Sequence, residues 1–209
     1  MNFFSGRRLY GILDLGYVSS DNALSMARRM LEGGVDVLQL RAKSQSPEVI
    51  REIATALAPI CRESGVPFLL NDHPHLVQET GADGVHVGQD DMPVAEVRRI
   101  VGPDAIIGLS THSLGQALAA CDAKPDYIGF GPLFSTPTKP DYQPVGLGGI
   151  AEVFRRVPLP VFCIGGIKLE NLGEVLAAGA GRVVIVSGIL QAGDPVAYCR
   201  KCAGILRGA

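Results

Sequence analysis

Several side chains of this sequence have the types and spacing needed to bind a metal ion. Asp72 and Asp91 each come after a short apolar run, residues 68–70 and 84–87, and turn residues bound both runs as they bound buried parallel strands. Because neighbouring strands lie about 5 Å apart, the two carboxylates could converge on one hard cation, with water and phosphate oxygens as its other ligands. The alternative is that both residues cap turns or helices.

Three cationic side chains could surround a group with several negative charges. Arg41 and Lys43 follow an apolar run, and Lys139 lies in a long stretch rich in Pro and Thr, and a loop of that length is usually functional. An unpaired guanidinium at a partly buried strand end is costly. We therefore expect Arg41 to contact either a bound polyanion or a carboxylate, Asp72 or Asp91. With a cation nearby, the first alternative indicates a diphosphate ligand.

Small residues near the end of the chain suggest a second anion site. Gly165-Gly166 and Ser187-Gly188 each follow an apolar run. Exposed backbone N–H groups in such turns, together with the Ser187 hydroxyl, can hold one phosphate. The alternative is that the glycines only make tight turns.

The elements that must position these residues alternate along the whole chain. We expect buried strands over residues 9–14, 35–40, 68–70, 84–87, 106–109, 127–130, 161–164 and 183–186. Helical spacing of apolar residues follows each of them, beginning with residues 21–32 and ending with 195–206. Eight such pairs predict a (β/α)8 TIM barrel that forms a single domain over residues 1–209. An open doubly wound sheet is the rival, but no G-x-G-x-x-G turn follows the first strand.

Composition and charge restrict the partners. A chain of 209 residues with 47 % hydrophobic residues and a net charge of −2 has no basic stripe for nucleic acid. Its apolar runs are too short for a membrane span or a signal peptide, so we expect a cytoplasmic protein with small-molecule ligands. A homo-oligomer is compatible with the sequence, which does not set the number of subunits. Five scattered cysteines form no disulfide framework, and Cys199-x-x-Cys202 lies in a helical pattern that favours packing over zinc or redox chemistry.

In order along the chain, eight short motifs resemble those of the thiamine-phosphate synthase family, also named thiamine-phosphate pyrophosphorylase. Singly they are weak, but together they cover nearly the whole sequence. The motifs are Gln39-x-Arg41-x-Lys43, Asn71-Asp72, His86-x-Gly88-Gln89-x-Asp91, Gly108-x-Ser110, Gly129-x-Gly131-Pro132, Thr136-x-Thr138-Lys139, Ile164-Gly165-Gly166-Ile167 and Val186-Ser187.

The resemblance implies a reaction and a set of site residues. The reaction couples a hydroxymethylpyrimidine diphosphate to a thiazole phosphate, with or without a carboxyl group on the thiazole, and releases diphosphate. Asp72 and Asp91 would hold Mg²⁺. The pyrimidine diphosphate would be held by Gln39, Arg41, Lys43, Asn71, Ser110 and Lys139, of which Arg41, Lys43, Ser110 and Lys139 would also assist catalysis. The thiazole phosphate would be held by Thr136, Thr138, Gly166, Val186 and Ser187.

The chemistry of this reaction requires no general base. When diphosphate departs, it leaves a pyrimidine-methyl cation that the thiazole nitrogen captures, so the protein need only neutralise the leaving group, align the partners and exclude water. We therefore expect His86 to line the wall of the pocket and His112 to be a loop or cap residue. The sequence departs from the family at Leu13-Asp14-Leu15, where Thr-Asp is usual, at Ala42, where an acidic residue is common, and at Val186, where Ile is usual.

Two other functions fit part of the sequence. A thiazole tautomerase on the same barrel would use a histidine in a position similar to His112, but it needs no metal and has no reason to keep Asp72, Asp91 and the Thr-x-Thr-Lys stretch together. A binding protein without catalytic activity could hold a phosphorylated ligand. One phosphate needs no metal, however, so two carboxylates beside three cationic residues argue against it.

Overall fold

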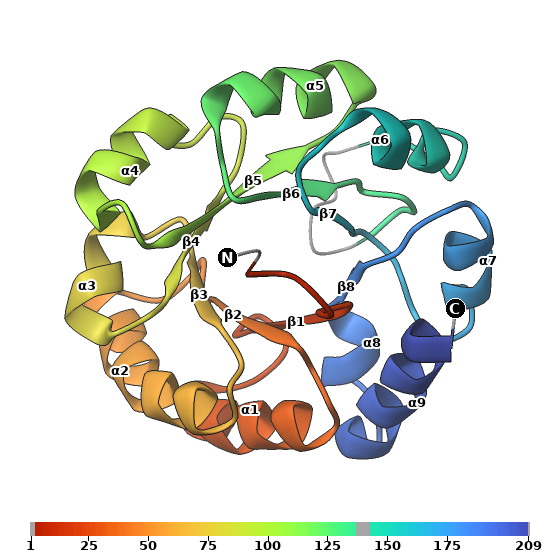
Figure 1. The fold of residues 1–209 in the computed structure, drawn as a ribbon. Coiled ribbons are helices and arrows are strands. Elements are labelled where there is room, and N and C mark those ends of the chain that lie inside the picture. The colour runs from red at the N-terminus through yellow and green to blue at the C-terminus, as the bar shows by residue number, and fades with distance from the viewer. Residues whose placement is uncertain (1–2, 137–142, 209) are drawn as a thin grey trace.

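Eight parallel strands form a closed barrel, and the helices surround it as an outer ring (Figure 1). The computed structural model describes residues 3–136 and 143–208. The strands follow one another around the barrel in the order β1 to β8, and β8 pairs with β1. This confirms the predicted TIM barrel and excludes the open sheet. None of the helices in the described ranges is long and apolar enough to cross a bilayer.

The element bounds lie close to those expected from the sequence. The strands are β1 Leu9–Asp14, β2 Val37–Arg41, β3 Phe68–Asn71, β4 Gly84–Val87, β5 Ile106–Thr111, β6 Tyr127–Phe130, β7 Val161–Cys163 and β8 Val183–Ile185. The α-helices are α1 Ala23–Glu32, α2 Pro47–Glu63, α3 Val77–Thr80, α4 Val94–Val101, α5 Leu114–Ala123, α6 Ile150–Arg156, α7 Leu172–Ala177, α8 Ser187–Leu190 and α9 Pro195–Gly208, with 3-10 helices η1 Ser20–Asn22 and η2 Pro74–Leu76. The sequence did not predict α8.

Phe4 fills the barrel interior at the end where the strands begin. It precedes β1, and its side chain is 1 % exposed. Its ring centroid lies 4.8 Å from that of Tyr127 and 5.4 Å from that of Phe162. In Figure 1 the red segment that leads into β1 crosses the centre of the ring, so this segment covers the end of the barrel where the strands begin. The interior is therefore a packed aromatic core and no channel.

We expect Phe4→Ala to lower the free energy of unfolding by about 3 kcal/mol, because it leaves a cavity among aromatic rings. Urea unfolding followed by circular dichroism would measure the loss. Phe3→Ala is the matched control, since the neighbouring Phe3 is 46 % exposed and its truncation should cost less than about 0.5 kcal/mol. Equal losses in the two variants would contradict the role given to Phe4.

An aspartate directly precedes three alternate strands, β2, β4 and β6, and fixes the register at the end of the barrel where the strands begin. Asp36, Asp83 and Asp126 stand directly before β2, β4 and β6. Each carboxylate accepts an N–H bond from a residue at the start of the preceding strand, at 3.0 Å from Leu9, 2.8 Å from Phe68 and 2.8 Å from Ile107. Each aspartate also donates its own N–H to the carbonyl of that same residue at 2.8 Å. The sequence analysis missed this repeat, whose signal is one Asp before each of these runs.

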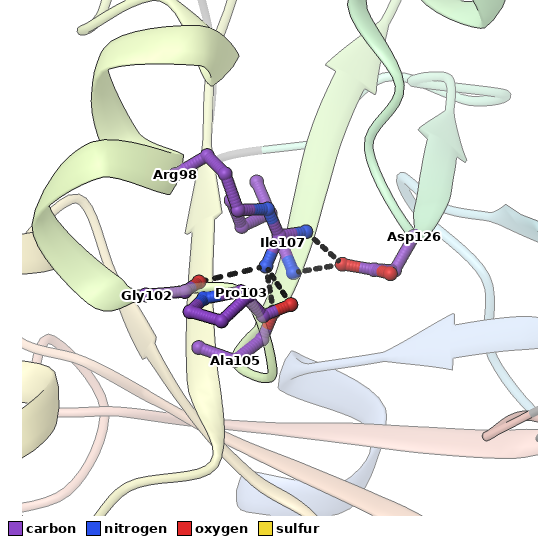
Figure 2. Close-up of polar contacts among 6 residues, drawn as sticks. All are labelled: Arg98, Gly102, Pro103, Ala105, Ile107 and Asp126. Carbon is purple, nitrogen blue, oxygen red and sulfur yellow. Dashed lines mark hydrogen bonds and ion pairs between the residues drawn. The ribbon is translucent and has the colours of Figure 1, made fainter.

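In the third copy of this repeat, Arg98 joins the Asp126 carboxylate (Figure 2). Arg98 extends from α4, and its Nη2 lies 2.7 Å from Asp126 Oδ2. Its Nη1 donates to three carbonyls of the α4–β5 turn, at distances of 3.1 Å to Gly102, 3.2 Å to Pro103 and 2.5 Å to Ala105. One guanidinium therefore connects the turn before β5 to the start of β6.

We expect Asp126→Ala to destabilise the barrel by about 1.5 kcal/mol, since it removes a charge-assisted bond to Ile107 and the partner of Arg98. The measurement is again urea unfolding. Asp104→Ala removes a carboxylate from the same turn, where the side chain is exposed, and should have almost no effect. If the two variants unfold at the same urea concentration, the carboxylate does not stabilise this end of the barrel.

The cysteine pair of the last helix packs in the core. Cys199 and Cys202 are free thiols on α9, and both are buried. Burial raises the pKa of Cys199 to about 12 and that of Cys202 to about 11. Metal binding and redox exchange need the thiolate, so this arrangement supports the packing role.

Candidate active site

A cavity of about 100 Å³ lies where the strands end. All the predicted site residues that the structure describes line this cavity: Gln39, Arg41, Lys43, Asn71, Asp72, Asp91, Ser110, Thr136, Gly166, Val186 and Ser187. They come from seven strand ends, those of β2 to β8, and the loops that follow them, which the closed barrel brings together. The predicted residues Thr138 and Lys139 lie outside the described residues.

Arg41 is held by a carboxylate that the sequence analysis did not assign to it. Its Nη1 donates to Asp14 Oδ2 at 2.6 Å, and Asp14 is 2 % exposed. The two residues are direct register partners at the ends of β1 and β2. The carboxylate alternative named Asp72 or Asp91 as the partner of Arg41, but the ion pair in the structure is with Asp14. The available signal was an acidic residue at the end of the first strand.

Asp72 adopts a backbone conformation that is uncommon for residues other than glycine. Its φ is 62°, in the left-handed region that costs about 1 kcal/mol or more and often marks functional sites. Its N–H donates to the carbonyl of His86 at 3.0 Å, and its Oδ2 forms an ion pair with Lys43 Nζ. The turn therefore sets a carboxylate and an exposed ammonium group side by side at the edge of the pocket.

Asp91 combines a capping contact with a position on the pocket wall. Its Oδ2 accepts the N–H of Gly88 at 2.6 Å, which closes the turn after β4. Both Asp72 and Asp91 line the cavity, and among the described residues no group of three or more His, Cys, Asp or Glu could enclose a metal. Two carboxylates with room for water and phosphate oxygens fit Mg²⁺, whereas a structural zinc site needs four protein ligands.

Gly165 and Gly166, in the second predicted anion site, must be glycines. Their φ angles are 99° and 67°. A Cβ on Gly166 would lie 2.7 Å from Cβ of Phe134, and one on Gly165 would lie 2.3 Å from Cβ of Pro132. The turn therefore presents bare backbone to the cavity. Ser187 begins the one-turn helix α8 beside it and also lines the cavity.

Buried polar side chains form a continuous hydrogen-bonded chain below the cavity. Gln39 Nε2 donates to Tyr10 Oη at 2.6 Å, and Tyr10 Oη lies 3.0 Å from Tyr127 Oη. Tyr127 Oη lies 2.8 Å from His86 Nδ1, and His86 Nε2 lies 2.9 Å from Ser110 Oγ. Burial raises the pKa of both phenols well above the ordinary value, so both tyrosines keep their protons.

The sequence analysis found only part of this chain. It named Gln39 and Ser110, and its expectation that His86 is a pocket wall is confirmed. Tyr10 and Tyr127 were missed, because inward-facing aromatic residues in strands have the pattern of ordinary core. His112 also lines the cavity, where the carbonyl of Gly131 lies 2.5 Å from its Nδ1. His112 lies in the loop between β5 and α5, as expected, and it is also part of the cavity wall.

Comparison with known proteins agrees with this geometry. The family model described as thiamine monophosphate synthase matches residues 9–189. The thiamine-phosphate synthase of Laribacter hongkongensis is 45 % identical over 182 residues, covering 87 % of this chain and 86 % of its own length. That of Shouchella clausii is 42 % identical over 188 residues, covering 90 % of both chains.

A solved structure extends the likeness to three dimensions. The thiamine phosphate pyrophosphorylase from Pyrococcus furiosus has a TM-score of 0.89 and 31 % sequence identity, covering 97 % of this chain and 96 % of its own. The family model spans most of the sequence, and both anion sites predicted for this chain lie within the matched residues. The chain therefore belongs to the thiamine monophosphate synthase family.

Proposed function

We propose that this protein is a thiamine-phosphate synthase, a transferase that joins a pyrimidinylmethyl group to a thiazole phosphate. The observation that carries the proposal is the convergence of two unlike anion sites in one cavity. One has cationic side chains next to the carboxylates of Asp72 and Asp91, and the other is the glycine turn at Gly166 with Ser187. A diphosphate leaving group with its metal and a singly phosphorylated acceptor need this combination.

On the first side, the diphosphate of 4-amino-2-methyl-5-(diphosphooxymethyl)pyrimidine is held by Gln39, Arg41, Lys43, Asn71, Ser110 and Lys139. Asp72 and Asp91 would hold Mg²⁺, which would neutralise charge on the diphosphate. Lys43 pairs with Asp72. Since Lys43 is half exposed, its ammonium can turn to the diphosphate when the substrate binds.

On the second side, 4-methyl-5-(2-phosphooxyethyl)thiazole or its carboxylated form is held by Thr136, Thr138, Gly166, Val186 and Ser187. The carbon–oxygen bond to diphosphate breaks, and the thiazole nitrogen donates its electron pair to the methylene carbon. Arg41, Lys43, Ser110 and Lys139 stabilise the negative charge that grows on the leaving group. No residue needs to remove a proton. The products are thiamine monophosphate and diphosphate, and CO₂ is released as well when the carboxylated thiazole is the acceptor.

The cellular setting follows from the substrates. Both are small phosphorylated molecules, and we propose that the protein acts on them in the cytoplasm, without nucleic acid or a membrane as partner. Residues 1–209 would form a single barrel domain.

Thiazole tautomerisation is the second candidate, because His112 lines the same cavity. An acid/base histidine at this position could move a proton on the thiazole ring. The tautomerase has no use for the carboxylates of Asp72 and Asp91, however, and this makes it the weaker candidate.

Diphosphate release by the purified protein distinguishes the candidates. With both substrates and Mg²⁺ we expect diphosphate and thiamine monophosphate in equal amounts, and no release when EDTA is added or when either substrate is omitted. Isomerisation of a thiazole phosphate that survives EDTA and is lost in His112→Ala would assign the tautomerase instead. Binding of the phosphorylated ligands without either reaction would leave a binding protein.

A further inference from the structure

Three neighbouring strands hold the middle of the buried polar chain in fixed geometry. His86 on β4, Gly108 on β5 and Tyr127 on β6 are successive register partners across the barrel wall. A Cβ at Gly108 would lie 2.4 Å from His86 Nδ1 and 2.2 Å from the Tyr127 ring. Because Gly108 has no side chain, the imidazole of His86 and the phenol of Tyr127 can form a direct hydrogen bond across β5.

The direction of each hydrogen bond in this chain follows from the number of protons. An amide nitrogen only donates, so the Tyr10 oxygen accepts from Gln39, and its single proton needs an acceptor. Tyr10 is 1 % exposed, and within the described part of the chain the Tyr127 oxygen is the acceptor that it reaches. The opposite direction would bury an unpaired O–H group, which costs about 1–3 kcal/mol. Tyr10 therefore donates to Tyr127.

The same count of protons then fixes the tautomer of His86 and the direction of its hydrogen bond to Ser110. Because Tyr127 accepts from Tyr10, its own proton goes to His86 Nδ1. A neutral imidazole that accepts at Nδ1 carries its proton at Nε2, which lies 2.9 Å from Ser110 Oγ. The Ser110 oxygen accepts this bond. Its remaining proton finds no acceptor among the described residues, and Ser110 lines the cavity.

We propose that Tyr10, Tyr127 and His86 are positioning residues, which hold His86 as the Nε2–H tautomer and thereby make Ser110 a hydrogen-bond donor to a ligand in the cavity. The ligand atom that Ser110 contacts is therefore an acceptor, such as a phosphate oxygen or an unprotonated ring nitrogen. The consequence for catalysis rests on the proposed function, in which Ser110 contacts the pyrimidine diphosphate. The tautomer itself does not depend on that function.

Nitrogen NMR of the histidine rings tests the tautomer in the protein without substrates. The chain has four histidines, and His86→Gln identifies the signals of His86. We expect one bonded proton at Nε2 and none at Nδ1 in the wild type. A proton at Nδ1, or protons on both nitrogens, would overturn the proposal without any variant. Since no substrate is present, this result is independent of whether the protein is a synthase.

Two matched variants test the direction of the chain. Tyr127→Phe and Tyr10→Phe each delete one buried phenolic oxygen, but only the first removes the proton given to Nδ1. We expect Tyr10→Phe to keep the Nδ1 chemical shift of a ring nitrogen that accepts a hydrogen bond, and Tyr127→Phe to move that shift, because it removes the donor. In Tyr127→Phe, kcat/KM for the pyrimidine diphosphate should fall about tenfold, as for one lost hydrogen bond, with KM for the thiazole phosphate unchanged. An unchanged Nδ1 shift in Tyr127→Phe would contradict the proposed direction.

Discussion

Replacing Asp91 by Ala is expected to lower the rate of diphosphate release about a thousandfold, because metal neutralisation of the leaving group supplies several kcal/mol. Asp91 lines the cavity but also closes the turn after β4 through the N–H of Gly88. The variant could therefore act through the metal or through the turn. Initial rates over a range of Mg²⁺ concentrations would measure the loss and any shift in the metal requirement.

Asp91→Asn distinguishes these two causes. Its side-chain oxygen can still accept from Gly88, but it has lost the charge that attracts Mg²⁺. If Asp91 is a metal ligand, the Asn variant should be nearly as inactive as the Ala variant at low Mg²⁺. Full activity of the Asn variant would mean that the turn contact alone matters. Asp90→Ala is the matched control, since the neighbouring Asp90 is exposed and absent from the cavity wall, and it should retain the wild-type rate.

The positions of most site residues could be predicted because a barrel fixes where strand ends meet. Once eight strands are assigned, Gln39, Asp72, Ser110 and Gly166 must face one opening, and the cavity confirms this. Errors of a few residues in the predicted strand boundaries did not change which residues face the opening. The strand containing Arg41, for example, extends over Val37–Arg41 where residues 35–40 were expected, and the order of strand ends around the opening is the same.

The missed contacts are those that depend on register between strands. Asp14 pairs with Arg41 because β1 and β2 align these two residues, and a strand pattern does not give this alignment. Tyr10 and Tyr127 are 117 residues apart in the sequence, yet their phenolic oxygens lie 3.0 Å apart in the barrel interior. Such pairs become visible only after the sheet closes, because an aromatic residue in an apolar run looks the same whether or not its hydroxyl has a buried partner.

Arg41→Met is expected to impair both stability and activity, through two different consequences of removing one guanidinium. Asp14 is 2 % exposed and receives the 2.6 Å bond from Arg41. Without that partner a buried carboxylate remains uncompensated, and the free energy of unfolding should fall by about 3–5 kcal/mol. The diphosphate would also lose a cationic contact, so we expect kcat/KM for the pyrimidine diphosphate to fall at least about a hundredfold.

A double variant separates the two consequences. Adding Asp14→Asn to Arg41→Met removes the uncompensated charge, so urea unfolding should show most of the lost stability restored. Activity should stay as low as in Arg41→Met, because neutralising Asp14 gives the diphosphate no new cation. Recovery of both stability and activity in the double variant would show that Arg41 only supports the fold. Recovery of stability alone would place the Arg41 guanidinium, which is 16 % exposed at the cavity wall, in contact with the leaving group.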